Sequence, residues 1–237
     1  MASSGTFTFS LDIHEIIEEA YELTGLEVKS GYQLKSARRA LDLMLTGWIN
    51  EGINLWTINQ LETTLTSGTA SYVLSAKYVD LLDAVTRDSN NIDSTANRIT
   101  LSEYLSYPDK TTSGKPTQYA IERNTDEGDK VYLYPVPDDT YTLVSWAMNY
   151  PEDTGNYTDN PDIPRRFLPP LVNGLAYNIA LKNPARMTPG EQGGQPTHVG
   201  GVSAGHRKEL LDQYMYSLKL AKDEDRERAS LHLVPSV

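Results

Sequence analysis

The segment HEIIE, residues 14–18, has the residue types of a zinc-protease helix. In such a helix two histidines four residues apart bind the metal, and a glutamate between them acts as the base. Here Glu18 stands where the second histidine would be, so the ligand pair is incomplete. Charged groups on a helix surface are the simpler interpretation, and we expect neither a metal site nor another cofactor.

Nucleophilic catalysis has few candidate groups in this sequence. Cysteine is absent, which excludes thiolate catalysis, disulfides and cysteine-ligated zinc, and which fits a reducing compartment. The histidines leave a Ser-His-Asp arrangement open, but no GxSxG elbow marks a nucleophile. They are His14, His198, His206 and His232. We therefore expect a protein that is not an enzyme, and we assign no catalytic residue.

A second set of metal-ligand types lies in the polar segment 153–162. Its carboxylate and amide oxygens belong to Asp153, Asn156, Asp159, Asn160 and Asp162. The segment lacks the central glycine and the closing glutamate of a calcium loop. Turn formation and the capping of a helix are the favoured functions of these residues.

The segment 184–205 is rich in glycine and proline and contains the glycine pairs 193–194 and 200–201. A glycine-rich loop before a helix can bind phosphate, but such loops follow a strand. This segment follows a predicted helix and has no GK[ST] sequence. We expect a long contact-forming or mobile loop.

The net charge of −11 opposes binding to nucleic acid, because an acidic surface repels phosphates unless a basic stripe overrides it. The arginine pairs at residues 38–39 and 165–166 lie beside apolar residues on predicted helices, so solvation or ion pairing is favoured over phosphate contact. The same acidic charge would suit a surface past which DNA slides without sticking.

The length of 237 residues is enough to bury roughly 70 to 75% of the unfolded surface, so a core needs no metal or disulfide. The N-terminal segment MASSGTFTFS lacks the basic and apolar regions of a signal peptide. The longest apolar run, around residues 168–181, is interrupted by prolines and asparagines. We expect synthesis in the cytosol and no membrane span.

Helical periodicity predicts two helices near the start of the chain. The first is expected over residues 11–24, with Ser10 as its N-cap and Gly25 closing it. The second begins at a capping box formed by Ser30 and Gln33 and ends at Gly52. Each carries an apolar stripe that must be buried against neighbouring elements.

From residue 57 to residue 150, short apolar runs alternate with turn residues at intervals of roughly ten positions, which predicts a β-sandwich or a small barrel. Residues 89–97 are expected to form a polar tip. A short helix is expected over residues 101–107, with Thr100 and Glu103 as its capping box.

The segment 150–182 returns the chain to helical periodicity. Asp162 is expected to cap a first turn there, which the prolines at 169 and 170 should end or kink before a second helix begins. A last helix is predicted over residues 206–230, with Ser203 as its cap and Met215 on its buried face.

Both ends of the chain carry apolar residues without a core of their own. In each end they alternate with polar residues, as strands do when they add to the sheet edge of another chain. They are Phe7 and Phe9 at the start, and Leu231, Leu233 and Val234 at the finish. We expect these ends to become ordered only when a partner receives them.

Four blocks of sequence follow one another along the chain. They are GWINEGINLW, PTQYAIERN, the run from VYLYPVPDDTYTLVSWAMNY to PRRFLPPLVNGLAYNIALK, and DRERASLHLVP. In this order they resemble the adaptor, or head-to-tail connector, proteins of short-tailed phages. That group includes the tubular tail A and P22-like tail accessory proteins.

The resemblance implies an α+β fold, in which a helical bundle formed by the N- and C-terminal segments carries an inserted β-rich, sandwich-like domain. The bundle would comprise residues 1–54 and 158–230, and the inserted domain residues 55–157. Residues 231–237 would form a docking tail.

The resemblance also implies a structural role in the neck or tail of a virion made in the host cytoplasm. Subunits would form a homo-oligomeric ring, a dodecamer, below the portal protein and extend the channel to the tail nozzle protein. DNA would pass through without sequence-specific binding, and no membrane would be involved. The tail would bind the portal through Leu231, His232, Leu233, Val234 and Pro235. The ring-interface candidates are Phe7, Phe9, Arg165 and Arg166.

Two other functions stay open. A tail-associated protein that binds a polysaccharide or a receptor is suggested by the aromatic residues of YLYP and SWAMNY, although these also suit a sheet core. A hydrolase of cell-wall or capsular polymer would use acidic residues such as Glu122 and Asp129.

Overall fold

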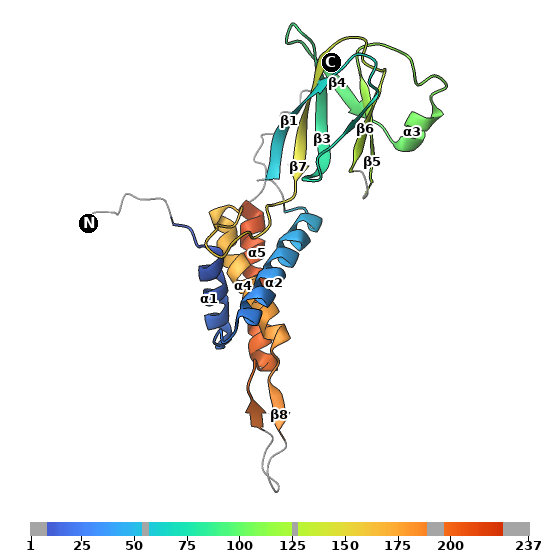
Figure 1. Cartoon of the computed structure of the whole chain (residues 1–237). Helices are drawn as coiled ribbons and strands as arrows, with labels where there is room; N and C mark the ends of the chain where they lie inside the picture. The colour runs from blue at the N-terminus through green and yellow to red at the C-terminus, as the bar shows by residue number, and fades with distance from the viewer. Residues whose placement is uncertain (1–8, 54–56, 125–127, 189–196, 225–237) are drawn as a thin grey trace, which may run out of the picture. The chain divides into compact units, whose positions relative to one another are not determined.

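A computed structural model describes residues 9–53, 57–124, 128–188 and 197–224 (Figure 1). The chain divides into two compact units. The first combines Met1–Leu55 with Pro151–Val237 and holds the long helices; the second, Trp56–Tyr150, holds the main sheet. The α+β class predicted from the sequence is therefore confirmed.

The first two helices begin at capping boxes. Helix α1 spans Ile13–Thr24, and its N-cap is Asp12, whose carboxylate accepts a hydrogen bond of 2.8 Å from the backbone of Glu15. Ser10 is therefore not the cap, although Gly25 closes the helix in the left-handed conformation as predicted. Helix α2 spans Gly31–Asn50 and has the predicted box of Ser30 and Gln33.

Helix α4, Leu168–Lys182, follows directly on a short 3-10 helix, η2, at Arg165–Phe167. The prolines at 169 and 170 lie in the first turn of α4, where a backbone donor has no partner within the helix. They therefore start α4, and the predicted end of a first turn before a second helix is confirmed, because η2 ends at Phe167 and α4 follows it. The predicted cap is wrong, because Pro164 occupies the N-cap position of η2 and no side chain caps it.

Helix α5 spans Ala204–Glu224. The hydroxyl of Ser203 accepts a hydrogen bond of 3.2 Å from the backbone of His206, which confirms the predicted cap. Met215 is 57% exposed, so its predicted burial is wrong. The strands β8, Arg186–Thr188, and β9, Thr197–Val199, pair between α4 and α5, so part of the predicted loop 184–205 is a hairpin.

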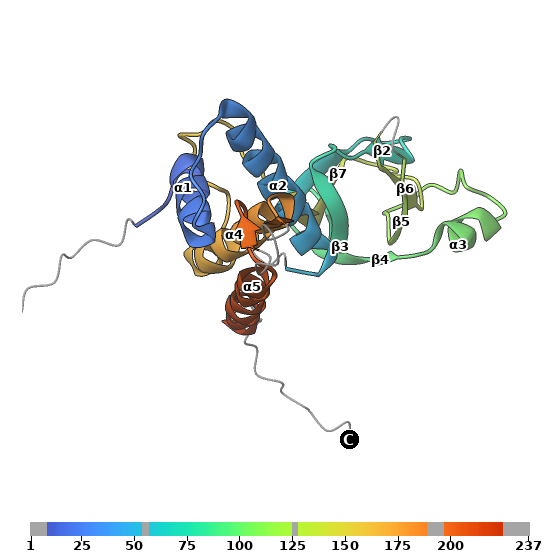
Figure 2. The ribbon, with the colours of Figure 1, turned by 90° about the horizontal axis from the view of Figure 1, so that it is seen from below.

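Helix α4 packs against α1, α2 and α5 (Figure 2). It can do so because it is apolar on most sides, with nine buried residues that include Leu171, Leu175 and Ile179. Trp48 of α2 packs against Phe167 with ring centroids 5.6 Å apart, and its indole donates a hydrogen bond of 2.9 Å to the hydroxyl of Tyr214 in α5. These contacts tie both chain ends into one core.

The second unit contains one seven-stranded sheet in the order β1-β7-β3-β4-β5-β6-β2. The strands are β1 Ile58–Leu65, β2 Ser71–Val73, β3 Tyr78–Arg87, β4 Asp93–Arg98, β5 Gln118–Glu122, β6 Lys130–Tyr134 and β7 Tyr141–Asn149. All pairs are antiparallel except β4 with β5. The sheet curls so that its strands share one core, which includes Leu65, Leu81, Tyr119, Leu133 and Ala147.

Two local predictions in this unit have different outcomes. Residues 93–98 form strand β4, so the predicted polar tip is shorter than expected. The strand escapes detection because its side chains are largely exposed and only Ala96 is buried. Helix α3, Leu101–Ser106, has the predicted box of Thr100 and Glu103.

Candidate interface groove beside the N-terminal segment

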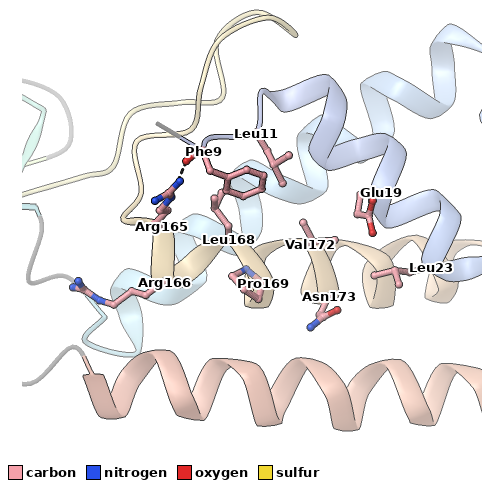
Figure 3. Close-up of a pocket in the computed structure, with 10 residues that line it drawn as sticks. All are labelled: Phe9, Leu11, Glu19, Leu23, Arg165, Arg166, Leu168, Pro169, Val172 and Asn173. Carbon is pink, nitrogen blue, oxygen red and sulfur yellow. Dashed lines mark hydrogen bonds between the residues drawn. The ribbon is translucent and has the colours of Figure 1, made fainter. Parts of the chain in front are cut away.

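The segment before α1 is bound to η2, which leads directly into α4, by Arg165 (Figure 3). The Arg165 Nε donates a hydrogen bond of 2.8 Å to the backbone oxygen of Phe9. Its guanidinium also lies 5.4 Å from the centre of the Phe9 ring, within the range of a cation–π contact. Phe9 itself stays 63% exposed, so this arrangement holds an apolar side chain at the surface.

A groove of about 760 Å³ opens beside Phe9. Its walls come from the N-terminal segment, α1, η2 and α4, as Figure 3 shows. The apolar part of the lining consists of Phe9, Leu11, Leu23, Leu168, Pro169 and Val172. The polar part consists of Glu19, Arg165, Arg166 and Asn173. An apolar floor with charges at its rim suits the binding of an apolar protein segment, and this lining contains no nucleophile–base pair.

The start of α1, one wall of the groove, is bound by the segment that follows the sheet unit. The backbone N–H groups of Ile13 and His14 donate to the carbonyl oxygens of Asp159 and Tyr157, at 3.0 and 2.9 Å. These bonds satisfy donors that the first turn of α1 cannot pair within the helix. Turn formation by the polar segment 153–162 accounts for further bonds, such as that from the Asn156 backbone to Asp159. The helix that it caps is α1, far away in the sequence.

The same segment is also bound to α2. The carboxylate of Asp42 accepts hydrogen bonds from the backbone and the hydroxyl of Thr154, at 3.0 and 2.7 Å. Arg38 donates to the backbone oxygen of Gly155 and lies over the ring of Tyr157. Arg38 therefore has a structural role within the chain.

The sequence model of the SU10 adaptor protein family matches residues 20–232, which is most of the chain. The chain belongs to the SU10 adaptor protein family. The predicted resemblance to phage head-to-tail adaptors is thereby confirmed. No curated protein matched the chain.

The groove of this SU10 adaptor brings together three of the predicted ring-interface residues, Phe9, Arg165 and Arg166. Arg166 lies over the ring of Phe167, with 5.4 Å between its guanidinium carbon and the ring centre. Phe7 and the predicted portal-binding residues lie outside the described residues; the latter are Leu231, His232, Leu233, Val234 and Pro235. The α1 wall of the groove was not predicted, although Leu23 belongs to the amphipathic pattern of that helix.

The residues considered for catalysis in this SU10 adaptor are engaged in local contacts. Glu122 accepts a hydrogen bond of 2.7 Å from the hydroxyl of Tyr132, which raises the pKa of Tyr132 above its ordinary value. Asp129 pairs with Arg123 and accepts a bond from the backbone of Asn124. These are bonds within the sheet unit.

Two further features of the described residues concern metal binding and membrane crossing. The Nε2 atom of His14 lies 3.2 Å from a carboxylate oxygen of Glu18 on α1. No group of three or more acidic or histidine side chains that could hold a metal occurs within the described ranges. Among the helices of those ranges, none combines the length and apolarity needed to cross a bilayer.

The aromatic side chains of the sheet unit are partly used in packing. Tyr107 stacks on Tyr134 with ring centroids 4.3 Å apart, and Tyr104 packs against Tyr132 at 5.3 Å. Trp146 is 51% exposed on β7. A single exposed tryptophan gives weaker support to polymer binding than the family match gives to an adaptor function.

Proposed function

We propose that this SU10 adaptor is a structural, non-enzymatic virion protein whose subunits form a dodecameric ring below the portal. The ring joins the DNA-filled head to the tail nozzle and extends the DNA channel. The family match over residues 20–232 carries the proposal, because it includes the sheet unit and most of the helical unit. The net charge of −11 supports a channel through which DNA passes without sequence-specific binding.

In this proposal the helices from both chain ends form the bundle that builds the ring, and the sheet unit is an inserted domain whose loops face the nozzle. The helical unit is made from both ends of the chain, up to residue 55 and from residue 151 onward. This division supports the insertion of the sheet unit between the two helical segments. It lies close to the domain limits expected from the sequence, residues 1–54, 55–157 and 158–230. The last segment, residues 231–237, is the proposed portal-docking tail.

The groove beside Phe9 supplies part of the ring interface. Its apolar residues are exposed in a single subunit, and burial by a neighbour would contribute about 25 cal/mol for each Å² removed from water. Arg165 and Arg166 lie at its rim. At that position they can pair with carboxylates of the adjacent copy, which limits the mutual repulsion of acidic subunits.

The function is tested by mixing the purified chain with its portal protein. Mass photometry and negative-stain images should show a mass increase and a ring added below the portal. Absence of any binding at micromolar concentrations would refute the proposal.

The tail is tested by deleting residues 231–237. Portal docking should weaken by at least tenfold, about 1.4 kcal/mol, because the apolar contacts of the tail are lost. The thermal unfolding of the free chain should stay unchanged, since the helices and the sheet do not need the tail. A matched control keeps the length and replaces Leu231, Leu233 and Val234 by serine. If both variants dock like the wild type, the tail has no part in docking.

A further inference from the structure

Helices α2 and α5 each expose a stripe that combines apolar and charged side chains. On α5 the stripe contains Asp212, Tyr216 and Leu220, of which Tyr216 is 66% and Leu220 51% exposed. On α2 it contains Arg39, Leu43 and Gly47, of which Leu43 is 68% exposed. Residues four apart lie on one face of a helix, so each set forms a single ridge.

We propose that the α5 stripe of one copy packs on the α2 stripe of the next copy, and that this contact closes the ring. The inference rests on the proposed ring function and names the two faces that build it. A ring of more than two subunits requires a heterologous contact, in which two different faces of each copy meet. Figure 2 shows α2 and α5 on different sides of α4, as such a contact needs.

The two stripes are complementary in charge and in shape. Both have the same spacing, so a parallel alignment that places Leu43 opposite Tyr216 also places Arg39 opposite Asp212 and Gly47 opposite Leu220. Within the described part of the chain, Arg39 and Asp212 have no ion-pair or hydrogen-bond partner. An exposed cation and an exposed anion at matching positions favour association of two copies.

Gly47 provides the space that Leu220 would fill. A side chain added at Gly47 would meet no other atom within 4 Å, so the space beside this glycine is open. A hollow of about 320 Å³ begins there and continues between Leu43 of α2 and Tyr177 and Lys182 of α4. An exposed leucine on one face and an open apolar hollow on the other are the parts of a ridge-and-groove contact.

Helix α5, which carries the stripe, adjoins the groove beside Phe9. Asn173, which lines the groove, donates a hydrogen bond of 3.2 Å to the hydroxyl of Ser217 on α5. The opposite flank of α5 is occupied within the copy, because Lys222 pairs with Glu51 of its own α2. One neighbouring copy can therefore cover both the groove and the stripe, while the α2 stripe contacts the neighbour on the other side.

Charge reversal in the full-length chain tests the pairing. Arg39→Glu and Asp212→Arg should each weaken ring formation on the portal by roughly tenfold per contact, because attraction becomes repulsion. The double variant should recover rings, and so should an equal mixture of the two single variants. The mixture recovers only if the pair lies between copies, since residue 39 of one copy then meets residue 212 of another.

The absence of cysteine permits a second measurement that does not use the portal. A variant with both Leu43→Cys and Tyr216→Cys should form a ladder of disulfide-linked oligomers on mild oxidation of the concentrated protein. A mixture of the two single variants should stop at dimers that contain one of each. Glu22→Arg and Lys29→Glu are matched controls, because both residues are exposed near the turn between α1 and α2 and should leave ring formation unchanged.

The possible failures are distinguishable. If the wild type forms rings but the reversed variants form them equally well, the α2–α5 contact is refuted and the adaptor function stands. If the single variants fail and neither the double variant nor the mixture recovers rings, the pairing of Arg39 with Asp212 is wrong. If the wild type forms no ring and the cysteine ladder is also absent, both proposals are overturned.

Discussion

Gly174 of α4 lies where side chains of both α2 and α5 pack directly against the helix. A Cβ atom at this position would lie 2.5 Å from the sulfur of Met44 and 2.8 Å from the ring of Tyr214. The Met44 side chain is flexible and can yield, but the Tyr214 ring is held by its hydrogen bond from Trp48. Gly174→Ala should therefore overpack this core at a cost of about 1–3 kcal/mol. Removal of glycine from a helix offsets about 0.5–1 kcal/mol of that loss.

Gly47→Ala is the matched control for this change. It also removes a glycine from a helix, but its Cβ would meet nothing within 4 Å, so the folded subunit should become more stable by about 0.5–1 kcal/mol. The difference between the two variants isolates the packing cost. With a urea dependence of about 2 kcal/mol/M, their unfolding midpoints should differ by about 0.5–1.5 M.

Urea unfolding followed by far-ultraviolet circular dichroism measures both midpoints, because the helices of the first unit dominate that signal. Equal midpoints for Gly174→Ala and Gly47→Ala would show that Met44 and Tyr214 do not crowd α4. The packing of α2 and α5 on α4 would then be wrong.

Two further predictions concern hydrogen bonds of single carboxylates. The bond to Asp138 raises the pKa of Tyr141 from 10.0 to about 12, so its stabilising effect is complete below pH 10 and is lost as the pH rises towards 12. Unfolding curves and phenolate absorbance across this range should show the effect, and Tyr141→Phe should abolish it. Asp42→Ala should cost about 1–3 kcal/mol, because the amide and hydroxyl of buried Thr154 lose their acceptor. Hydrogen exchange at residues 153–159 should then accelerate, and unchanged exchange would refute this anchoring role.

The structural features that could be predicted from the sequence are those specified within one turn of chain. The boxes Ser30–Gln33 and Thr100–Glu103 are local, since each partner lies three residues from the other. The start of α1 was misplaced at Ser10 although its box of Asp12 and Glu15 is equally local. Two further donors of its first turn are satisfied by Tyr157 and Asp159, far along the chain. No periodicity within the helix contains that information.

The same distinction explains the errors in the sheet. Strand β4 has the sequence DSTANR, which carries no apolar alternation. Its extended conformation follows from pairing with β3 on one side and β5 on the other.

The residue types that line the candidate groove could be predicted from the sequence. The way in which distant segments of the chain come together to form the groove could not. Exposed phenylalanine and paired arginines indicated an interface, yet Arg165 and Phe9 are 156 positions apart. Their contact depends on α1 and α4 packing side by side, which requires the whole helical unit to be folded. For this reason Phe9, Arg165 and Arg166, the predicted interface residues that the structure describes, lie in one groove. The contribution of Leu23 to the apolar wall of that groove was not predicted.

The exposed apolar side chains of the helical unit are not the result of a weak core. Trp48, Phe167 and Leu171 are fully buried, so the unit has enough apolar interior to be stable while Phe9, Leu43 and Tyr216 stay at the surface. Identical subunits with a net charge of −11 repel one another, and an assembly of them needs cations placed at the contacts. Arg39 lies beside Leu43, and Arg165 lies beside Phe9. The exposed apolar groups thus lie next to arginines that would reduce the repulsion between acidic copies. A ring built from repeated heterologous contacts requires this arrangement.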